Sequence, residues 1–219
     1  MAKIERPKYL TPVGVLGWPC AIQEPDTKFA DDKDPNDKGD YKARMVFSKE
    51  DPKAKAFLAN LESIWEQFAN EEQAKLGKKK LKTDEESLPW ADELDRETQE
   101  PTGNIVFRFK LKARVTKKDG TFFEQRPKVF GSDNKLIVNV PPIGAGSQVV
   151  LSGKVHLWHT SKAGMTLWLE AVQLRKLVEK DAGGKAEDYG FEAADGGYTD
   201  DSVFESAVSN AGGDNNGDF

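Results

Sequence analysis

The sequence predicts an all-β body with one inserted helix, followed by a disordered acidic tail. Three observations carry this prediction: several short segments in which apolar and polar residues alternate, one long segment with helical spacing of its apolar residues, and a change of composition near residue 179. The chain has 219 residues, which is enough to bury one hydrophobic core. We therefore divide it into a folded domain, residues 1–178, and a tail, residues 179–219.

A single long helix is expected from about Asp51 to Leu76. Asp51 can accept hydrogen bonds from the first turn as an N-cap, and Pro52 has the backbone geometry that the first turn requires. The apolar residues that follow recur at steps of three and four, so they form one stripe that can pack against the rest of the domain. Gly77 is expected to end the helix.

Strands are expected on both sides of the helix. Residues 104–116 form the clearest one, because apolar and polar side chains alternate strictly through it. The Asp119-Gly120 pair that follows is typical of a tight hairpin, so residues 121–130 are expected to return as its antiparallel neighbour. Further strands are expected at Pro12–Ile22, Tyr41–Ser48, Lys135–Asn139, Gln148–His159 and Met165–Leu177.

This order of elements favours a closed barrel over an alternating α/β fold. Hairpins and a glycine-rich turn at Gly144–Gly146 connect the strands, and only one helix interrupts them. Among small barrels of this kind we expect the five-stranded OB-fold. Two polar segments, Glu24–Asp40 and Gly77–Gly103, are predicted to be long loops.

The tail and the body have opposite charge. Residues 179–219 contain eleven acidic residues and two lysines, which gives a charge of −9, so residues 1–178 carry about +4 of the total of −5. The tail has too few apolar residues to offset the entropy of ordering, and we predict that it is disordered. It ends on Asp218 and Phe219, where an aromatic ring and the terminal carboxylate could anchor in a pocket of a partner. A tail that only improves solubility is the other interpretation.

Basic side chains recur at every second position on several predicted strands, so they share one face and lie about 7 Å apart. Trp158 and Trp168 also fall on polar faces, while Trp18 could belong to the core or to a surface platform. A basic groove with aromatic faces is what binds single-stranded nucleic acid, although such a face can also be merely solvated. The candidate DNA-binding residues are Lys42, Arg44, Arg108, Lys110, Lys112, Arg114, Arg126, Lys128, Lys154, Trp158 and Trp168.

Motifs for catalysis are missing from the sequence. It contains no phosphate-binding loop, no nucleophile elbow and no acidic nuclease motif. Cys20 is the only cysteine, and His156 and His159 would lie on opposite faces of a strand, so we expect no metal site and no cofactor. There is no run of roughly 18 apolar residues and no signal peptide, and we expect a cytoplasmic protein without membrane contact. A hydrolase or nuclease with unfamiliar residues is the enzymatic alternative.

Several segments together resemble the single-stranded DNA-binding proteins encoded by tailed bacteriophages. The similar segments are Gly39–Asn70, Phe107-Arg108-Phe109-Lys110, Pro142–Ser147, Leu167–Val178 and the terminal Gly217-Asp218-Phe219.

The resemblance implies an OB-fold that coats single-stranded DNA with little sequence preference during phage replication, recombination and repair in the host cytoplasm. It further implies that the tail recruits replication proteins such as a polymerase, helicase or primase, and it carries no catalytic residue. The oligomeric state stays open between a monomer and a homodimer. A non-enzymatic adaptor of the replication machinery, in which the tail is the functional element, is the alternative.

Overall fold

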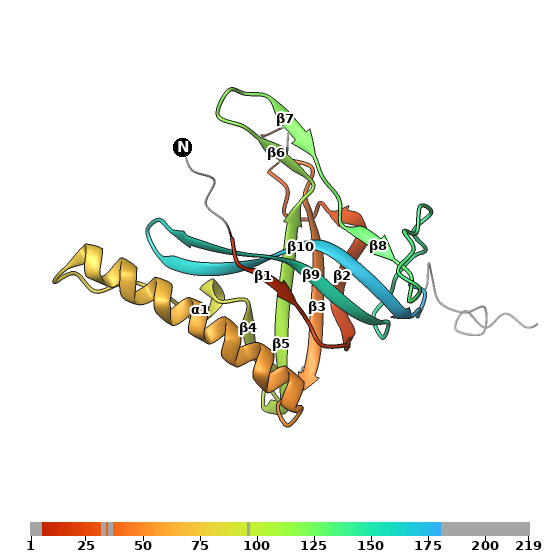
Figure 1. Cartoon of the computed structure of the whole chain (residues 1–219), viewed down its shortest axis with the longest axis horizontal. Helices are drawn as coiled ribbons and strands as arrows, with labels where there is room; N and C mark the ends of the chain where they lie inside the picture. Colours follow the sequence, from red (N-terminus) through yellow and green to blue (C-terminus); the bar gives the residue numbers. More distant parts are fainter. Residues whose placement is uncertain (1–5, 32–33, 35–36, 96, 181–219) are drawn as a thin grey trace, which may run out of the picture. The chain divides into compact units, whose positions relative to one another are not determined.

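The computed structural model describes residues 6–31, 34, 37–95 and 97–180, and the chain up to Lys180 forms one compact unit (Figure 1). The first two residues of the predicted tail, Glu179 and Lys180, belong to the described part: Glu179 forms an isolated bridge with Ile143, and the backbone N–H of Lys180 donates to the carbonyl of Pro142 at 2.8 Å. The rest of the predicted tail, residues 181–219 with Asp218 and Phe219, lies outside the described residues. The elements of the described part are β1 (Lys8–Leu10), β2 (Gly14–Asp26), β3 (Asp40–Ser48), α1 (Pro52–Leu76), the 3-10 helix η1 (Glu85–Ser87), β4 (Trp90–Leu94), β5 (Pro101–Lys112), β6 (Arg114–Thr116), β7 (Phe122–Glu124), β8 (Lys128–Phe130), β9 (Gln148–His159) and β10 (Ala163–Lys176).

Five strands close into a barrel in the order β2, β3, β5, β10, β9. Neighbouring strands are antiparallel except for β5 and β10, which run parallel. The ring closes where Gly14 and Val15 of β2 pair with Val149 and Gln148 of β9. This pairing is that of the OB-fold, and it confirms the predicted five-stranded barrel. β1, β4 and β8 extend the sheet beside β9, β5 and β10 respectively.

The core lies inside this ring, and the helix covers part of it. Phe107 of β5 is fully buried, with its ring centroid 5.8 Å from that of Phe47 on β3 and 5.0 Å from that of Phe57 on α1. The helix begins and ends where the sequence predicts. The side chain of Asp51 accepts a hydrogen bond from the backbone of Lys53 at 2.8 Å, and Gly77 follows the last turn.

A close approach between strands explains one glycine of the barrel. The hydroxyl of Tyr9 on β1 donates a hydrogen bond to the carbonyl of Trp168 on β10 at 2.8 Å. This contact passes over Gly153 of β9, where a Cβ would lie 1.7 Å from the Trp168 carbonyl oxygen and 2.9 Å from the Tyr9 hydroxyl. Burial raises the pKa of Tyr9 well above its usual value, so the hydroxyl remains a donor.

Gly153→Ala is therefore expected to destabilise the domain by about 1–3 kcal/mol or more, because the added methyl group forces strands β9 and β10 apart. Urea unfolding followed by far-UV circular dichroism measures this loss. Ser152→Ala, one position away on the same strand, is the control and is expected to change the unfolding free energy by less than about 0.5 kcal/mol. Equal stability of the two variants would show that the strands accommodate the methyl group.

The predicted strand Lys135–Asn139 is wrong. One isolated bridge joins Leu136 to Phe130, and the segment otherwise forms a loop. Leu136 is 55% exposed and Val138 is 80% exposed, and of the apolar residues in this segment only Ile137 packs against the core, which is too little burial to hold the segment as a strand. Conversely, the predicted loop Gly77–Gly103 contains η1 and β4. β4 forms because Trp90 packs against the core while the strand pairs with β5.

The hairpin after β5 is shorter than predicted. Ala113 is buried, and its backbone N–H donates to the carbonyl of Gly39 at 2.9 Å, but the chain bends at this residue, so the long strand ends at Lys112. β6 and β7 then form a separate two-stranded sheet, and β8 pairs in parallel with β10. Residues 121–130 are thus not a continuous antiparallel neighbour of the basic row on β5.

Candidate nucleic-acid interface

Four cationic side chains meet on the outer face of β3 and β5. Lys42 is the cross-strand partner of Lys110, and Arg44 is the partner of Arg108. They project outward because the alternate residues of both strands are buried in the core. Like charges directly opposite each other on a sheet are unfavourable, so folding alone does not explain this arrangement. We call these four residues, with Trp18 and Phe29 beside them, the β3–β5 face.

Carboxylates of the same chain contact three of these cations: Asp26 with Lys42 at 2.8 Å, Glu93 with Arg44 at 3.2 Å, and Asp40 with Lys110 at 2.9 Å. The hydrogen bond from Lys42 lowers the pKa of Asp26, so this carboxyl group is ionised at neutral pH. Ion pairs near the surface contribute only about 0–1 kcal/mol each, and these pairs therefore leave the cations able to bind phosphate instead.

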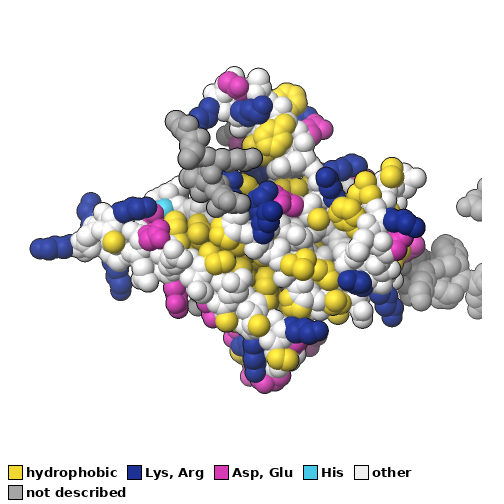
Figure 2. Space-filling model, viewed as in Figure 1, with side chains coloured by type: hydrophobic (Ala, Val, Ile, Leu, Met, Phe, Trp, Pro, Cys, Tyr) yellow, Lys and Arg dark blue, Asp and Glu magenta, His cyan; other side chains and the backbone are white. Residues whose placement is uncertain are grey.

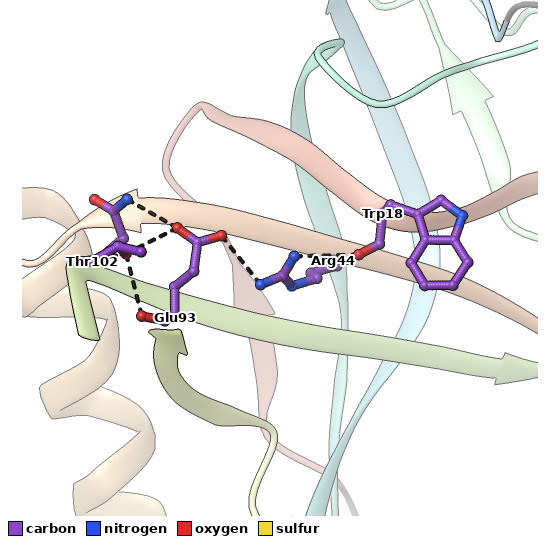
Figure 3. Close-up of polar contacts among 5 residues, drawn as sticks. Trp18, Arg44, Glu93 and Thr102 are labelled. Carbon is purple, nitrogen blue, oxygen red and sulfur yellow. Dashed lines mark hydrogen bonds and ion pairs between the residues drawn. The ribbon is translucent and has the colours of Figure 1, made fainter. Parts of the chain in front are cut away.

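Arg44 holds the backbone of Trp18 while the indole ring remains exposed (Figure 3). Its Nη1 donates to the Trp18 carbonyl at 3.3 Å, and its Nη2 contacts the Glu93 carboxylate at 3.2 Å. Thr102 and Asn104 donate to the same carboxylate at 3.1 and 3.0 Å. The Trp18 side chain is 67% exposed, and Figure 3 shows its ring pointing away from these contacts. A ring that is exposed on a fixed backbone is suited to stacking on a base.

Phe29 supplies a second exposed ring on the β3–β5 face. It is 77% exposed, and the Lys42 ammonium lies 5.3 Å from its ring centroid. Trp18 and Phe29 both line a cavity of about 570 Å³, whose lining includes the apolar Pro142 and Ile143. Phe29 was not among the residues predicted from the sequence, because it lies in a polar loop without periodicity. The sequence feature that could have identified Phe29 is its position as a single aromatic residue among charged residues.

The basic surface continues across the next two strands. Trp168 of β10 is the register partner of Lys110 on one side and of Lys154 of β9 on the other. A row from Lys42 through Lys110 and Trp168 to Lys154 therefore crosses four strands of the barrel. Lys154 contacts the carboxylate of Glu170 at 2.5 Å, so it is ion-paired like three of the cations on the β3–β5 face.

The two predicted tryptophans on this part of the barrel are half-buried rather than exposed. The ring of His156 stacks on Trp168 with centroids 4.6 Å apart, and the Arg6 guanidinium lies 4.5 Å from the Trp168 ring. Burial and the charge of Arg6 lower the pKa of His156, which favours the neutral ring. Trp158 donates from Nε1 to the Thr166 hydroxyl at 3.2 Å and covers Gly164, so it packs the β9–β10 pair.

The remaining predicted residues lie elsewhere. Lys112 is exposed at the end of β5 and continues the row of Arg108 and Lys110. Arg114 lies on β6; its side chain is only 15% exposed, and its guanidinium is ion-paired with Glu124. Arg126 lies in the connection between β7 and β8 and lines a cavity with Gln23 and Glu24, not the β3–β5 face. Lys128 lies on β8 opposite Ala171 of β10, so its predicted place beside the basic row is wrong.

Other reactive side chains are engaged in local contacts. The Cys20 thiol donates to the carbonyl of Ile143 at 3.4 Å, and burial raises its pKa to about 11. His159 Nδ1 lies 2.7 Å from the Glu72 carboxylate on α1, whereas His156 stacks on Trp168. Among the described residues no group of three or more His, Cys, Asp or Glu side chains could hold a metal ion. In the same part of the chain no helix is long and apolar enough to cross a membrane.

Comparisons with known proteins show which family the chain belongs to. The family model described as single-stranded DNA-binding protein, bacteriophage T7, matches residues 13–177. A single-stranded DNA-binding protein of Enterobacteria phage T3 is 29% identical over 212 residues, which cover 91% of this chain and 88% of that protein. The crystal structure of gp2.5, a single-stranded DNA-binding protein encoded by bacteriophage T7, has the same fold, with a TM-score of 0.62 and 23% identity over 89% of this chain and 99% of that one. Because the family model matches far more than half of the sequence, this chain belongs to the family of phage single-stranded DNA-binding proteins typified by that of bacteriophage T7.

Proposed function

We propose that this chain binds single-stranded DNA on the β3–β5 face and performs no chemistry on it. The observation that carries the proposal is the exposed Trp18 ring, held through its backbone by Arg44 beside the cationic pairs of β3 and β5. Single-strand binding needs aromatic faces for the bases and cations for the phosphates, and both occur together here.

The row from Lys42 to Lys154 gives the strand a path across the barrel. Cations along it contact phosphates, which are the same at every nucleotide, and aromatic rings stack on bases of any kind. Binding with little sequence preference follows from these contacts. The similar protein of phage T3 is named for binding single-stranded DNA, which supports the same ligand.

A titration with fluorescent oligo-dT at low and high salt tests the proposal. Lys110→Ala is expected to weaken binding severalfold at low salt, and the difference from wild type is expected to shrink at high salt, because phosphate contacts are screened. Lys53→Ala is the matched control: it removes an exposed lysine from helix α1, away from the face, and should leave the affinity unchanged.

A duplex of the same length is expected to bind more weakly than the single strand, because its bases cannot stack on protein rings. Equal affinity for both forms would contradict a single-strand site. No binding of DNA by the wild-type chain would instead favour the adaptor function, with the cations of the β3–β5 face as a solvated surface.

We further propose that the chain coats single-stranded DNA during replication, recombination and repair of a phage genome in the host cytoplasm, as a monomer or a homodimer. The tail, with a charge of −9 and the terminal Asp218 and Phe219, is proposed to recruit a polymerase, helicase or primase. A truncation after Lys180, the last residue of the compact unit, separates the two roles, because it should retain DNA binding and lose the contact with the replication protein.

A further inference from the structure

The β6–β7 hairpin carries two exposed phenylalanines outside the barrel. Phe122 is 51% exposed and Phe123 is 43% exposed, although the two short strands form a sheet of their own. Figure 1 shows the hairpin projecting beyond β5, and Figure 2 shows hydrophobic side chains next to Lys and Arg side chains on it. A two-stranded hairpin gains little stability by itself, so core packing does not account for two large exposed rings.

Each of these rings has a cation near it. The Arg114 guanidinium lies 4.3 Å from the Phe122 ring centroid, and the Lys117 ammonium lies 6.0 Å from that of Phe123. Adjacent strand residues point to opposite faces, so each face of the hairpin has one ring and one cation. Lys118 adds a further charge at the exposed turn. The pairing of ring and cation repeats that of Phe29 with Lys42 on the β3–β5 face.

Hydrogen bonds fix the base of the hairpin to the proposed DNA site. The backbone N–H of Gln125 donates to Ala113, and its side chain donates to the carbonyl of Lys112, both at 2.9 Å. Ala113 in turn donates to Gly39, next to the start of β3. The hairpin therefore continues the line of β5, on which Arg108, Lys110 and Lys112 lie.

The spacing along this line places the hairpin within reach of the same DNA strand. Thr116 is the cross-strand partner of Phe122 and follows Lys110 by six residues, a distance of at most about 20 Å along an extended strand. An oligonucleotide bound at Lys110 needs only a few more nucleotides to arrive at Phe122. A shorter one fills the β3–β5 face alone.

We propose that the β6–β7 hairpin is a second base-stacking platform that lengthens the single-stranded DNA site beyond the barrel. Phe122 and Phe123 stack on bases at the two faces of the hairpin, and Lys117 and Lys118, at the turn that joins the strands, contact the phosphates between these bases. This inference rests on the proposed binding of single-stranded DNA by the β3–β5 face, and it adds a part of the site that fills only when the strand is long enough.

The test is the affinity for a series of oligo-dT lengths from about 4 to about 16 nucleotides, the range of site sizes found for OB-folds. For wild type, affinity is expected to rise until both platforms are filled. In Phe122→Ala/Phe123→Ala the rise is expected to stop at a shorter length, with a loss of about fivefold or more for the longest oligonucleotide and no change for the shortest ones that bind. Phe122→Tyr/Phe123→Tyr keeps both rings and should restore the wild-type curve.

Lys117→Ala/Lys118→Ala gives an independent readout. It should lower the slope of log affinity against log salt by about 0.7 for each lost phosphate contact, and only for the long oligonucleotides. Val138→Ala removes an exposed apolar side chain from another loop and should change neither measurement.

The inference is overturned if the alanine variants follow the wild-type curve at every length, or if they lose the same factor at every length. Failure of the proposed function has a different result, because wild type would then bind no oligonucleotide of any length. Melting temperatures of all variants are expected to match that of wild type, since neither ring belongs to the core.

Discussion

Trp18→Ala is expected to weaken the binding of single-stranded DNA by about 1–3 kcal/mol, the usual cost of removing one ring that stacks on a base. The side chain is 67% exposed, so the free energy of unfolding should change by less than about 0.5 kcal/mol. Fluorescence anisotropy with labelled oligo-dT measures the first quantity and urea unfolding measures the second. Trp18→Phe, which keeps an aromatic face, should lose much less affinity.

Trp158→Ala is the matched control for this variant. Trp158 donates a hydrogen bond to Thr166 and packs over Gly164, so its removal is expected to lower stability more than it lowers affinity. Wild-type affinity in Trp18→Ala would contradict base stacking at this position. A large loss of stability in the same variant would show that its effect on binding arises from unfolding.

Phe107→Ala is expected to have the largest effect on stability, about 3–5 kcal/mol. The ring is fully buried and contacts Phe47 of β3 and Phe57 of α1, so its loss leaves a cavity where the barrel and the helix meet. Such a loss is a large part of the roughly 5–15 kcal/mol that stabilises a domain. Urea or thermal unfolding measures it.

Phe29→Ala makes the same chemical change at a site that is 77% exposed. It should leave the unfolding free energy within about 0.5 kcal/mol of wild type while weakening DNA binding. The two phenylalanines thus separate packing from ligand contact. Comparable unfolding free energies for the two variants would contradict the assignment of Phe107 to the core.

Regular alternation made the outer faces of the barrel strands predictable from sequence. On β3, and on β5 from Phe107 onward, every second residue is buried, so the period of two was enough to assign Lys42, Arg44, Arg108 and Lys110 to one surface. The helix was equally predictable, since Asp51 caps it and its apolar stripe packs on the barrel. These features depend on local sequence and on the repeat of each element.

Features that depend on contacts distant in sequence were not predictable. The pairing of β2 with β3 shifts register between Gly17 and Ala21, so alternation could not decide the direction of Trp18. The Asp119-Gly120 turn is predictable from the sequence, but the bend at Ala113 that separates β5 from β6 is not, because Ala113 continues the alternation of apolar and polar residues. The predicted strand over residues 121–130 therefore includes Arg126, which lies in the connection between β7 and β8.

The ion pairs of the β3–β5 face determine which anions the cations give up when DNA binds. Three cations hold carboxylates of the same chain: Lys42 with Asp26, Arg44 with Glu93, and Lys110 with Asp40. Salt weakens DNA binding because the Lys and Arg side chains of the protein release small cations that are condensed on the DNA phosphates. Each of these side chains must be available to replace a released cation. Each phosphate contact made by one of these three cations exchanges one ion pair for another, so the face carries its own counterions. The three cations are thereby already held in position before DNA binds, and phosphate groups can displace the carboxylates that hold them.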